Sequence, residues 1–262
     1  MKIIFILLLS LFFFSPDAVP QVVIRSDSSL PSMQEQYRTG NWIAVSTDNK
    51  LTVIGVSNPL LRRQDEITAA KEDAARKIAM YYGIQANMEV TNRTGFDFFD
   101  YEHESNIEIK YDTNFEKYID QLTFDPENDV LRTSEAVFIR FKYNTSVEGI
   151  NYSVRIENDR PSWTRNQNKP DFEGYVTVVG FSRNQRRLKD TILKSIENAV
   201  VRMIEETSTT VKTREVSAAG QGSSGFIHAI SEGTLSNFMV IEFWVEPQTR
   251  FVYTLAIARI VE

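Results

Sequence analysis

A six-residue segment recurs in this chain 125 positions after its first occurrence. Residues Thr52–Ser57 read Thr-Val-Ile-Gly-Val-Ser, and residues Thr177–Ser182 read Thr-Val-Val-Gly-Phe-Ser. In the same register, Glu72–Ala74 (Glu-Asp-Ala) returns as Glu197–Ala199 (Glu-Asn-Ala). Each copy of a duplicated unit has to bury its own apolar face, so a repeat constrains the architecture strongly. Two copies of ~100 residues each predict two small domains rather than one large core.

Each half predicts a strand followed by an amphipathic helix. The β-branched runs Leu51–Ser57 and Tyr175–Ser182 predict buried strands. Apolar residues at spacings of three and four then predict a helix in each half. These residues are Ile67, Ala70, Ala74, Ile78 and Tyr81 in the first half, and Leu188, Ile192, Ile196, Ala199 and Met203 in the second. Opposite the first stripe, the i,i+4 pairs Glu72–Arg76 and Asp73–Lys77 predict a solvated face.

Alternating residues predict the strands that close each half. Residues 137–143 show the period of two that is typical of a half-buried strand, and Gly149–Ile156 is its expected hairpin partner. In the second half, Phe238–Val245 and Phe251–Ile260 are the expected strands, with a turn at residues 247–249. The predicted fold class is therefore α+β, with two tandem repeats, each a mostly antiparallel sheet packed against one main helix.

The amino terminus predicts export. Lys2 precedes the apolar run Ile3–Phe14, and Ser15–Ala18 interrupts it, as in a secretory signal. This run is well short of the ~20 residues that a membrane-spanning helix needs. We therefore expect cleavage after Ala18, release into the periplasm or cell envelope, and membrane contact that is peripheral at most. The expected organisation is a signal peptide over 1–18, an extended leader over 19–40, a first repeat domain over 41–156 and a second repeat domain over 157–262, with a polar linker at 157–170.

Charge and composition exclude several classes of function. The net charge of −6 and pI of 5.2 give no electrostatic reason to expect a nucleic-acid partner. The chain has no cysteine, which excludes thiolate chemistry, cysteine-ligated zinc and lipid anchoring through cysteine. With 42% hydrophobic and 24% charged residues, the composition is that of an ordinary folded domain.

Short motifs in both halves carry a family resemblance. They are Trp42, Val53–Ser57 and Ala74–Arg76 in the first half, and Pro161, Trp163, Val179–Ser182 and Tyr253–Ala256 in the second. Together they resemble the bacterial LPP-twenty lipoprotein domain, which is related in fold to the amino-terminal module of the flagellar H-ring assembly protein. The resemblance implies an exported α+β envelope protein with no established catalytic residues, although this chain lacks the lipidated cysteine. The expected function is a non-enzymatic structural or assembly component that binds envelope proteins, with flagellar and outer-membrane components as candidates.

An aromatic and acidic segment interrupts the first half. Its four aromatic residues are Phe96, Phe98, Phe99 and Tyr101. We align the halves by treating Phe138 and Val240 as equivalent. Gly55 and Phe138 are then 83 positions apart, whereas Gly180 and Val240 are 60 apart, so the first half holds about 23 extra residues. Extra length on a repeated scaffold forms loops, where function concentrates. Aromatic anchors beside charged side chains suit an interface, so these four residues are the predicted partner-binding site.

The same segment offers a weaker metal-binding alternative. Carboxylates and imidazoles suit divalent cations, but no ligand spacing in the segment is diagnostic. The candidate ligands are Asp97, Asp100, Glu102, His103 and Glu104. The other histidine, His228, lies in an apolar run that favours a core or edge position over a base. We therefore predict no catalytic residue, metal or cofactor, and keep a periplasmic ligand-binding or metal-dependent hydrolytic protein as the alternative function.

Paired arginines stand at the expected start of each helix. Arg62 and Arg63 precede the first helical stripe, and Arg186 and Arg187 precede the second. The helix macrodipole favours acidic side chains at this end. Arginines there could help the helix amino terminus to hold an anionic group, for example on a wall polymer or lipid. The alternative is that these long side chains simply extend into solvent.

Overall fold

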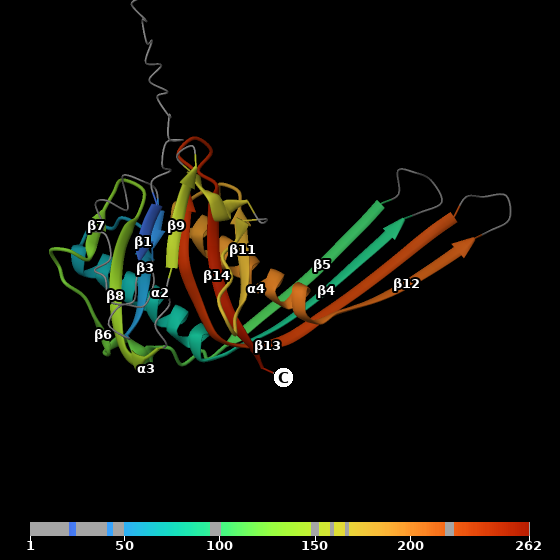
Figure 1. Ribbon diagram of the computed structural model, residues 1–262, viewed down its shortest axis with the longest axis horizontal. Coiled ribbons are helices and arrows are strands. Elements are labelled where there is room, and N and C mark those ends of the chain that lie inside the picture. Colours follow the sequence, from blue (N-terminus) through green and yellow to red (C-terminus); the bar gives the residue numbers. More distant parts are fainter. Residues whose placement is uncertain are drawn as a thin grey trace, which may run out of the picture.

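Two long helices and two long β-hairpins dominate the computed structural model (Figure 1). It describes residues 21–24, 41–43, 50–94, 101–147, 152–157, 160–165, 168–217 and 223–261. The helices are α2 (Arg63–Tyr82), α3 (Glu116–Ile119) and α4 (Leu188–Ser208), with a 3₁₀ turn η1 (Ser162–Thr164). The longest strands are β4 (Ile84–Thr94), β5 (Tyr101–Tyr111), β12 (Thr209–Ser217) and β13 (Ser223–Val245). The α+β class is confirmed.

The strands form three sheets. The largest has the order β11-β14-β13-β4-β5, with β12 and β2 also paired to β13. A second has the order β3-β8-β6 with β7 on β8, and a third has the order β1-β9-β10. The remaining strands are β1 (Gln21–Ile24), β2 (Asn41–Ile43), β3 (Lys50–Ser57), β6 (Leu122–Thr123), β7 (Val130–Arg132), β8 (Val137–Ser146), β9 (Tyr152–Glu157), β10 (Arg160–Pro161), β11 (Val176–Ser182) and β14 (Val252–Val261).

Each long helix lies against the strand that precedes it, at a glycine. A Cβ added to Gly55 in β3 would lie 2.2 Å from the Ala70 carbonyl oxygen of α2. A Cβ added to Gly180 in β11 would lie 2.0 Å from the Ser195 carbonyl oxygen of α4. Both distances are shorter than any real contact, so each helix approaches its strand more closely than a larger residue allows. The repeated glycine is therefore required by packing.

Hydrogen bonds beside these glycines recur at the same offset of 125 residues. In the first half, the Val56 amide donates to Asp73 (2.8 Å), and Lys77 donates to the Ile54 carbonyl (2.6 Å). In the second half, Asn198 donates to the Phe181 carbonyl (2.7 Å), and Arg202 donates to the Val179 carbonyl (2.8 Å). These are the equivalent positions in both helices and both strands. Each helix is thus hydrogen-bonded to the backbone on either side of its glycine.

The charged face of the first helix differs from the prediction. Asp73 and Lys77 form an ion pair of 2.7 Å, but both are buried against β3 rather than solvated. The spacing of four was correct and the exposure was wrong, because the pair serves the strand backbone. Glu72 and Arg76 are much more exposed and lie 3.9 Å apart, as a solvated pair does. The predicted apolar stripes of both helices are buried or partly buried.

The closing strands correct two further predictions. The described part of the expected hairpin partner, residues 152–156, does not pair with β8, because β9 pairs with β1 and β10 instead. The register also sets a different alignment of the halves. Gly55 lies opposite Ile139, 84 positions later, and Gly180 lies opposite Thr254, 74 positions later. The first half is therefore about ten residues longer by this register, and not 23, because Val240 belongs to the strand beside β14.

The two predicted domains share one sheet. Strand β4, before the expected boundary at residue 157, pairs with β13 over eleven register positions from Ile84 to Thr94. Strand β2, with Trp42, also pairs with β13. The expected linker contributes to the core as well, since Trp163 is fully buried. Burial of each half thus depends on strands from the other.

Candidate functional site

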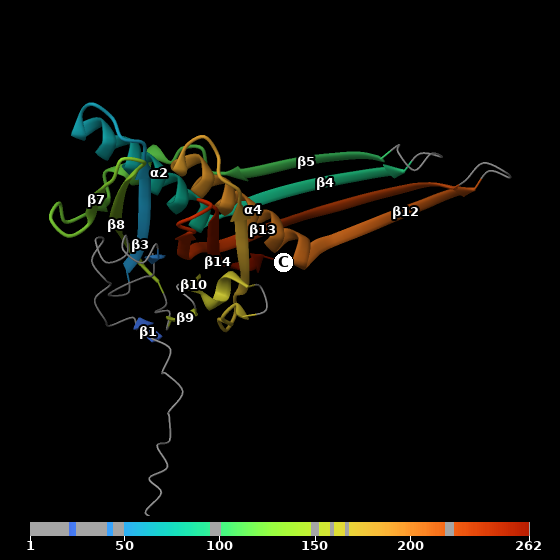
Figure 2. The ribbon, with the colours of Figure 1, turned by 90° about the horizontal axis from the view of Figure 1, so that it is seen from above.

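Four strands extend beyond the helices as an arm, which we define as β4, β5, β12 and residues 223–233 of β13. Figure 1 shows the arm leaving the helix-covered body on one side, and Figure 2 shows the same projection in a perpendicular view. The strand order across the arm is β5-β4-β13-β12, and every neighbouring pair is antiparallel. The body consists of the remaining described residues.

Both margins of the arm are open edges. Among the described residues, β5 pairs only with β4, and β12 pairs only with β13. An open edge presents unpaired backbone N–H and C=O groups that can accept a further strand. With eleven residues in β5 and nine in β12, these edges are longer than typical strands. The arm is therefore suited to strand addition at either margin.

The base of the arm has one apolar face and one polar face. Ile84, Ala86 and Met88 in β4 are buried, whereas the alternating Gln85, Asn87 and Glu89 are exposed. In the neighbouring β5, Ile107 shares the face of Met88 by register yet is 42% exposed. The apolar face thus lies under the helices at β4 and becomes accessible at the β5 margin.

The predicted aromatic site falls mostly outside the described residues. Phe96, Phe98 and Phe99 lie outside the described residues, and only the backbone of Tyr101, the first residue of β5, is described. The segment is no unique insertion, because β12 and β13 form a second hairpin at the corresponding place after α4. The sequence predicted an insertion loop from this segment onward, whereas residues 101–111 form strand β5, and neither hairpin of the arm was predicted.

The alternative metal site lies largely outside what the structure describes. Asp97 and Asp100 fall outside the described residues, and only the backbone of Glu102, His103 and Glu104, consecutive in β5, is described. Over the part of the chain that the structure describes, no group of three or more acidic or histidine side chains could hold a metal ion. His228 is a register partner of Thr91 and Lys212 in the arm.

Two of the four predicted arginines line an open polar cavity of about 510 Å³. Arg186 and Arg187 face segments from the first half, at residues 58–60 and 134–135, together with Arg250. Neither Arg186 nor Arg187 has an ion-pair partner among the described residues, whereas Arg250 pairs with Glu135. We call this cavity the basic groove. No sequence signal related Arg250 or Glu135 to the paired arginines, because they are far apart in the chain.

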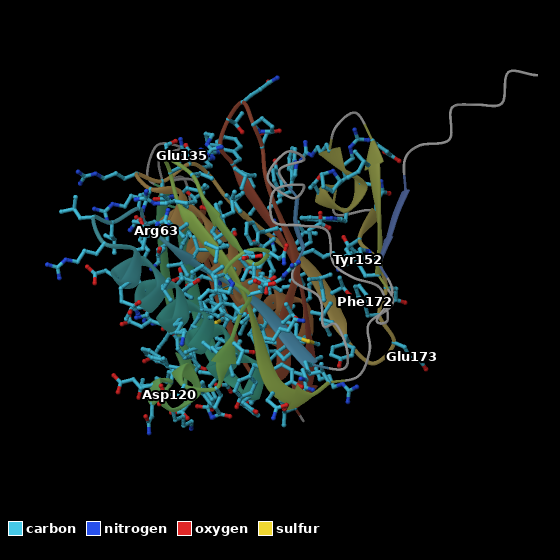
Figure 3. The ribbon with its side chains drawn as sticks, turned by 90° about the vertical axis from the view of Figure 1, so that its left-hand side faces the viewer. Arg63, Asp120, Glu135, Tyr152, Phe172 and Glu173 are labelled. Atoms are coloured by element: carbon cyan, nitrogen blue, oxygen red, sulfur yellow. The ribbon has the colours of Figure 1, made fainter. Side chains whose placement is uncertain are left out.

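Arg62 and Arg63 do not line the basic groove. Both are exposed, and Figure 3 shows Arg63 on the same side of the molecule as Glu135. Helix α2 begins at Arg63 without a side-chain cap, and α4 begins directly after Arg187. The predicted positions at the helix starts are confirmed, but the structure joins only the second pair to a cavity.

The loops around the basic groove are held in the same way in both halves. The Glu66 carboxylate accepts the Leu60 amide at 2.8 Å and is paired with Arg132 at 2.9 Å. At the position 125 residues later, the Thr191 hydroxyl accepts the Gln185 amide at 3.0 Å. Each loop before a long helix is therefore fixed by a side chain from the first turns of that helix.

A buried carboxyl lies in the body, away from these surfaces. Glu242 sits where β13 carries a bulge opposite β14, and its Oε2 accepts hydrogen bonds from Tyr152 and from Trp163 Nε1 (2.8 Å). Burial raises the pKa of Glu242 to about 7, and the two donors oppose that shift. Figure 3 shows Tyr152 and Phe172 close together on this side, where their rings lie 6.2 Å apart.

The Glu242 cluster joins three separate elements of the body. Its three members come from β9, η1 and β13, and all are buried. Burial likewise raises the pKa of the Tyr152 hydroxyl. The other oxygen of Glu242, Oε1, has no partner among the described residues. The cluster fastens residues 152–163 onto the large sheet, which explains why the predicted linker is part of the core.

Comparisons with known proteins add no relative. Within the described part of the chain, no helix combines the length and apolar character that crossing a membrane requires. No protein-family model matches the sequence, and neither the curated proteins nor the solved structures give a significant match. The resemblance to the LPP-twenty domain therefore stays a prediction that depends on short motifs alone.

Proposed function

We propose that this protein is a non-enzymatic assembly component of the cell envelope that binds other proteins through its arm. The observation that carries the proposal is the pair of open edges, on β5 and β12, beyond the helix-covered body. Open edges of this length are usually covered or interrupted in soluble proteins, because they invite pairing with another chain. An arm that keeps two of them is best explained by a partner.

Two further features support the proposal. The signal-like amino terminus favours export, and intact-mass analysis of the exported protein should show that residues 1–18 are missing. The paired contacts at an offset of 125 residues favour a duplicated domain, as the resemblance to an envelope family implies. Duplication would account for the two hairpins of the arm.

The test removes most of the arm and leaves the body intact. Glu89 pairs with Asn106, and Thr210 pairs with Ile230, so an Asn-Gly turn can join each pair in place of residues 90–105 and 211–229. We expect this short-arm variant to fold with a cooperative transition, because the buried clusters of the body remain. After cross-linking in cells and purification from the envelope fraction, we expect it to lose the proteins that the full chain retains.

The matched control changes a different surface. A chain with Arg186→Ala and Arg187→Ala keeps the arm and should retain the same proteins as the unmodified chain. Recovery of those proteins by a folded short-arm variant, in equal amounts, would overturn the proposed function.

The basic groove favours a second function, the binding of an anionic ligand. Arg186 and Arg187 supply two cations without a described ion-pair partner at a cavity of about 510 Å³, which is large enough for a small molecule. Titration calorimetry with inorganic pyrophosphate tests this function. Binding by the short-arm variant that disappears in the chain with both arginines replaced supports it, and no heat from either protein counts against it.

A further inference from the structure

The register of the arm aligns acidic residues at one edge with basic residues at the other. Two rows of register partners cross the arm from β5 to β12. The outer row is Glu102, Arg93, Phe226 and Arg214, and the inner row is Glu104, Thr91, His228 and Lys212. Each row therefore begins with a glutamate on β5 and ends with a lysine or arginine on β12.

The four charged edge positions of these two rows share one face of the sheet. Glu102 and Glu104 are two residues apart in β5, and Lys212 and Arg214 are two residues apart in β12. Residues two apart in a strand share a face, and register partners in neighbouring strands share it too. A sheet continued across both edges would therefore keep these four positions on one face.

The strand directions allow the two edges to meet. Strand β5 runs from the far end of the arm toward the body, and β12 runs from the body outward. When two arms lie side by side and point the same way, β5 of one is antiparallel to β12 of the other. Without stagger, this pairing sets Glu102 against Arg214 and Glu104 against Lys212. A stagger of two residues still leaves one acidic residue opposite a basic one.

We propose that copies of this chain associate head to tail, with the β5 edge of one arm paired to the β12 edge of the next. The occupant of each edge is thus a second copy of the same chain. Opposite charges facing each other across a strand pair stabilise it, and like charges destabilise it. Pairing of β5 with β5 would oppose glutamates, and pairing of β12 with β12 would oppose cations, so the charges select the head-to-tail arrangement.

This inference rests on the proposed function, because it names the partner of the same arm. A head-to-tail interface uses two different surfaces, so it is not complete in a dimer and continues into a closed ring or an open filament.

The experiment reverses the charge of each edge separately in the full exported chain. One variant carries Glu102→Lys and Glu104→Lys, and the other carries Lys212→Glu and Arg214→Glu. Sedimentation velocity should show oligomers for the unmodified chain and monomers for each variant, with dissociation constants raised at least tenfold. The first variant has two basic edges and the second has two acidic edges, so an equimolar mixture should assemble again.

Two outcomes of the charge-reversal experiment would overturn the inference. Oligomers that are unaffected by either reversal, or a mixture of the two folded variants that stays monomeric, exclude the proposed pairing. If a reversal prevents folding, the milder Glu102→Gln and Glu104→Gln variant replaces it. Assembly of that variant should then lose most of the salt dependence shown by the unmodified chain, and an unchanged salt dependence contradicts the pairing.

A monomeric unmodified chain separates the two proposals. If it is monomeric at every concentration but its arm still retains other envelope proteins, the head-to-tail inference fails while the proposed function stands. If the short-arm variant also retains those proteins, both fail.

Discussion

The body and the arm share the long strand β13 but are held in different ways. In the body, each helix lies against a glycine and is hydrogen-bonded to the strand backbone on both sides of it. In the arm, the strands are held by one another, and the margins are open. The difference indicates two roles: the body fixes the position of the arm, and the edge strands of the arm are available to pair with another chain.

The largest loss of stability should follow from filling the contact between a glycine and its helix. Gly180→Ala would place a Cβ 2.0 Å from the Ser195 carbonyl oxygen and 2.7 Å from the Ala199 amide nitrogen. Because the obstacle is helix backbone, we expect a loss of roughly 4 kcal/mol or more in the free energy of unfolding, measured with urea. Gly83→Ala is the control, since its Cβ meets nothing within 4 Å and the backbone is extended.

The next largest effect should come from the buried ion pair of the first half. Asp73→Ala leaves Lys77 buried without its carboxylate, which costs about 3–5 kcal/mol for pairs of this kind. The equivalent Asn198→Ala removes a neutral hydrogen bond to the Phe181 carbonyl and should cost about 1–3 kcal/mol. Both variants are compared by thermal or urea unfolding. If Asp73→Ala and Asn198→Ala lower the free energy of unfolding equally, the charge of the Asp73–Lys77 pair adds nothing to the attachment of the first helix.

The body should also lose stability as pH rises toward neutrality. The pKa of Glu242 is raised from 4.5 to about 7 in the folded chain, so the folded state binds the proton more tightly than the unfolded state. Stability is then full below pH 4.5 and falls through about pH 7, by on the order of 3 kcal/mol. The comparison is between urea unfolding of the unmodified chain and of Glu242→Gln over this range. A slope that persists in the variant would assign it to another group.

The smallest effect on stability should come from the arm. Ile107→Thr replaces a residue that is 42% exposed, so the free energy of unfolding should change by less than about 0.5 kcal/mol. The matched substitution in the body is Ile139→Thr, at a fully buried position of β8, which should cost several times more. Similar losses at the two positions would mean that the arm is part of the core.

The local pattern of the sequence predicted the body better than the arm. The spacing of apolar residues located α2 and α4, and the β-branched runs located β3 and β11, because these signals act within one element. The pairing of β4 with β13 joins residues about 130 positions apart, as in Gly225 with Thr94, and no local pattern encodes it. The arm is built on this long-range pairing.

The sequence also did not show which polar and charged residues are buried. An i,i+4 pair such as Asp73 and Lys77 has the same spacing on a solvated face as in a buried contact with a strand, so its sequence does not distinguish the two. Likewise, the polar stretch before Trp163 has the composition of a linker. Long-range contacts, such as the burial of Trp163 and its hydrogen bond to Glu242, 79 residues away, make it part of the core.

Hydrogen–deuterium exchange tests the division between body and arm most directly. The unmodified chain is measured dilute and concentrated, and peptides from β5 and β12 are compared with peptides from α2 and α4. If the arm is the surface of association, amides of β5 and β12 should become protected on assembly while the helices stay unchanged. Protection that appears over the helices, with both edge strands still exchanging freely, would contradict the account.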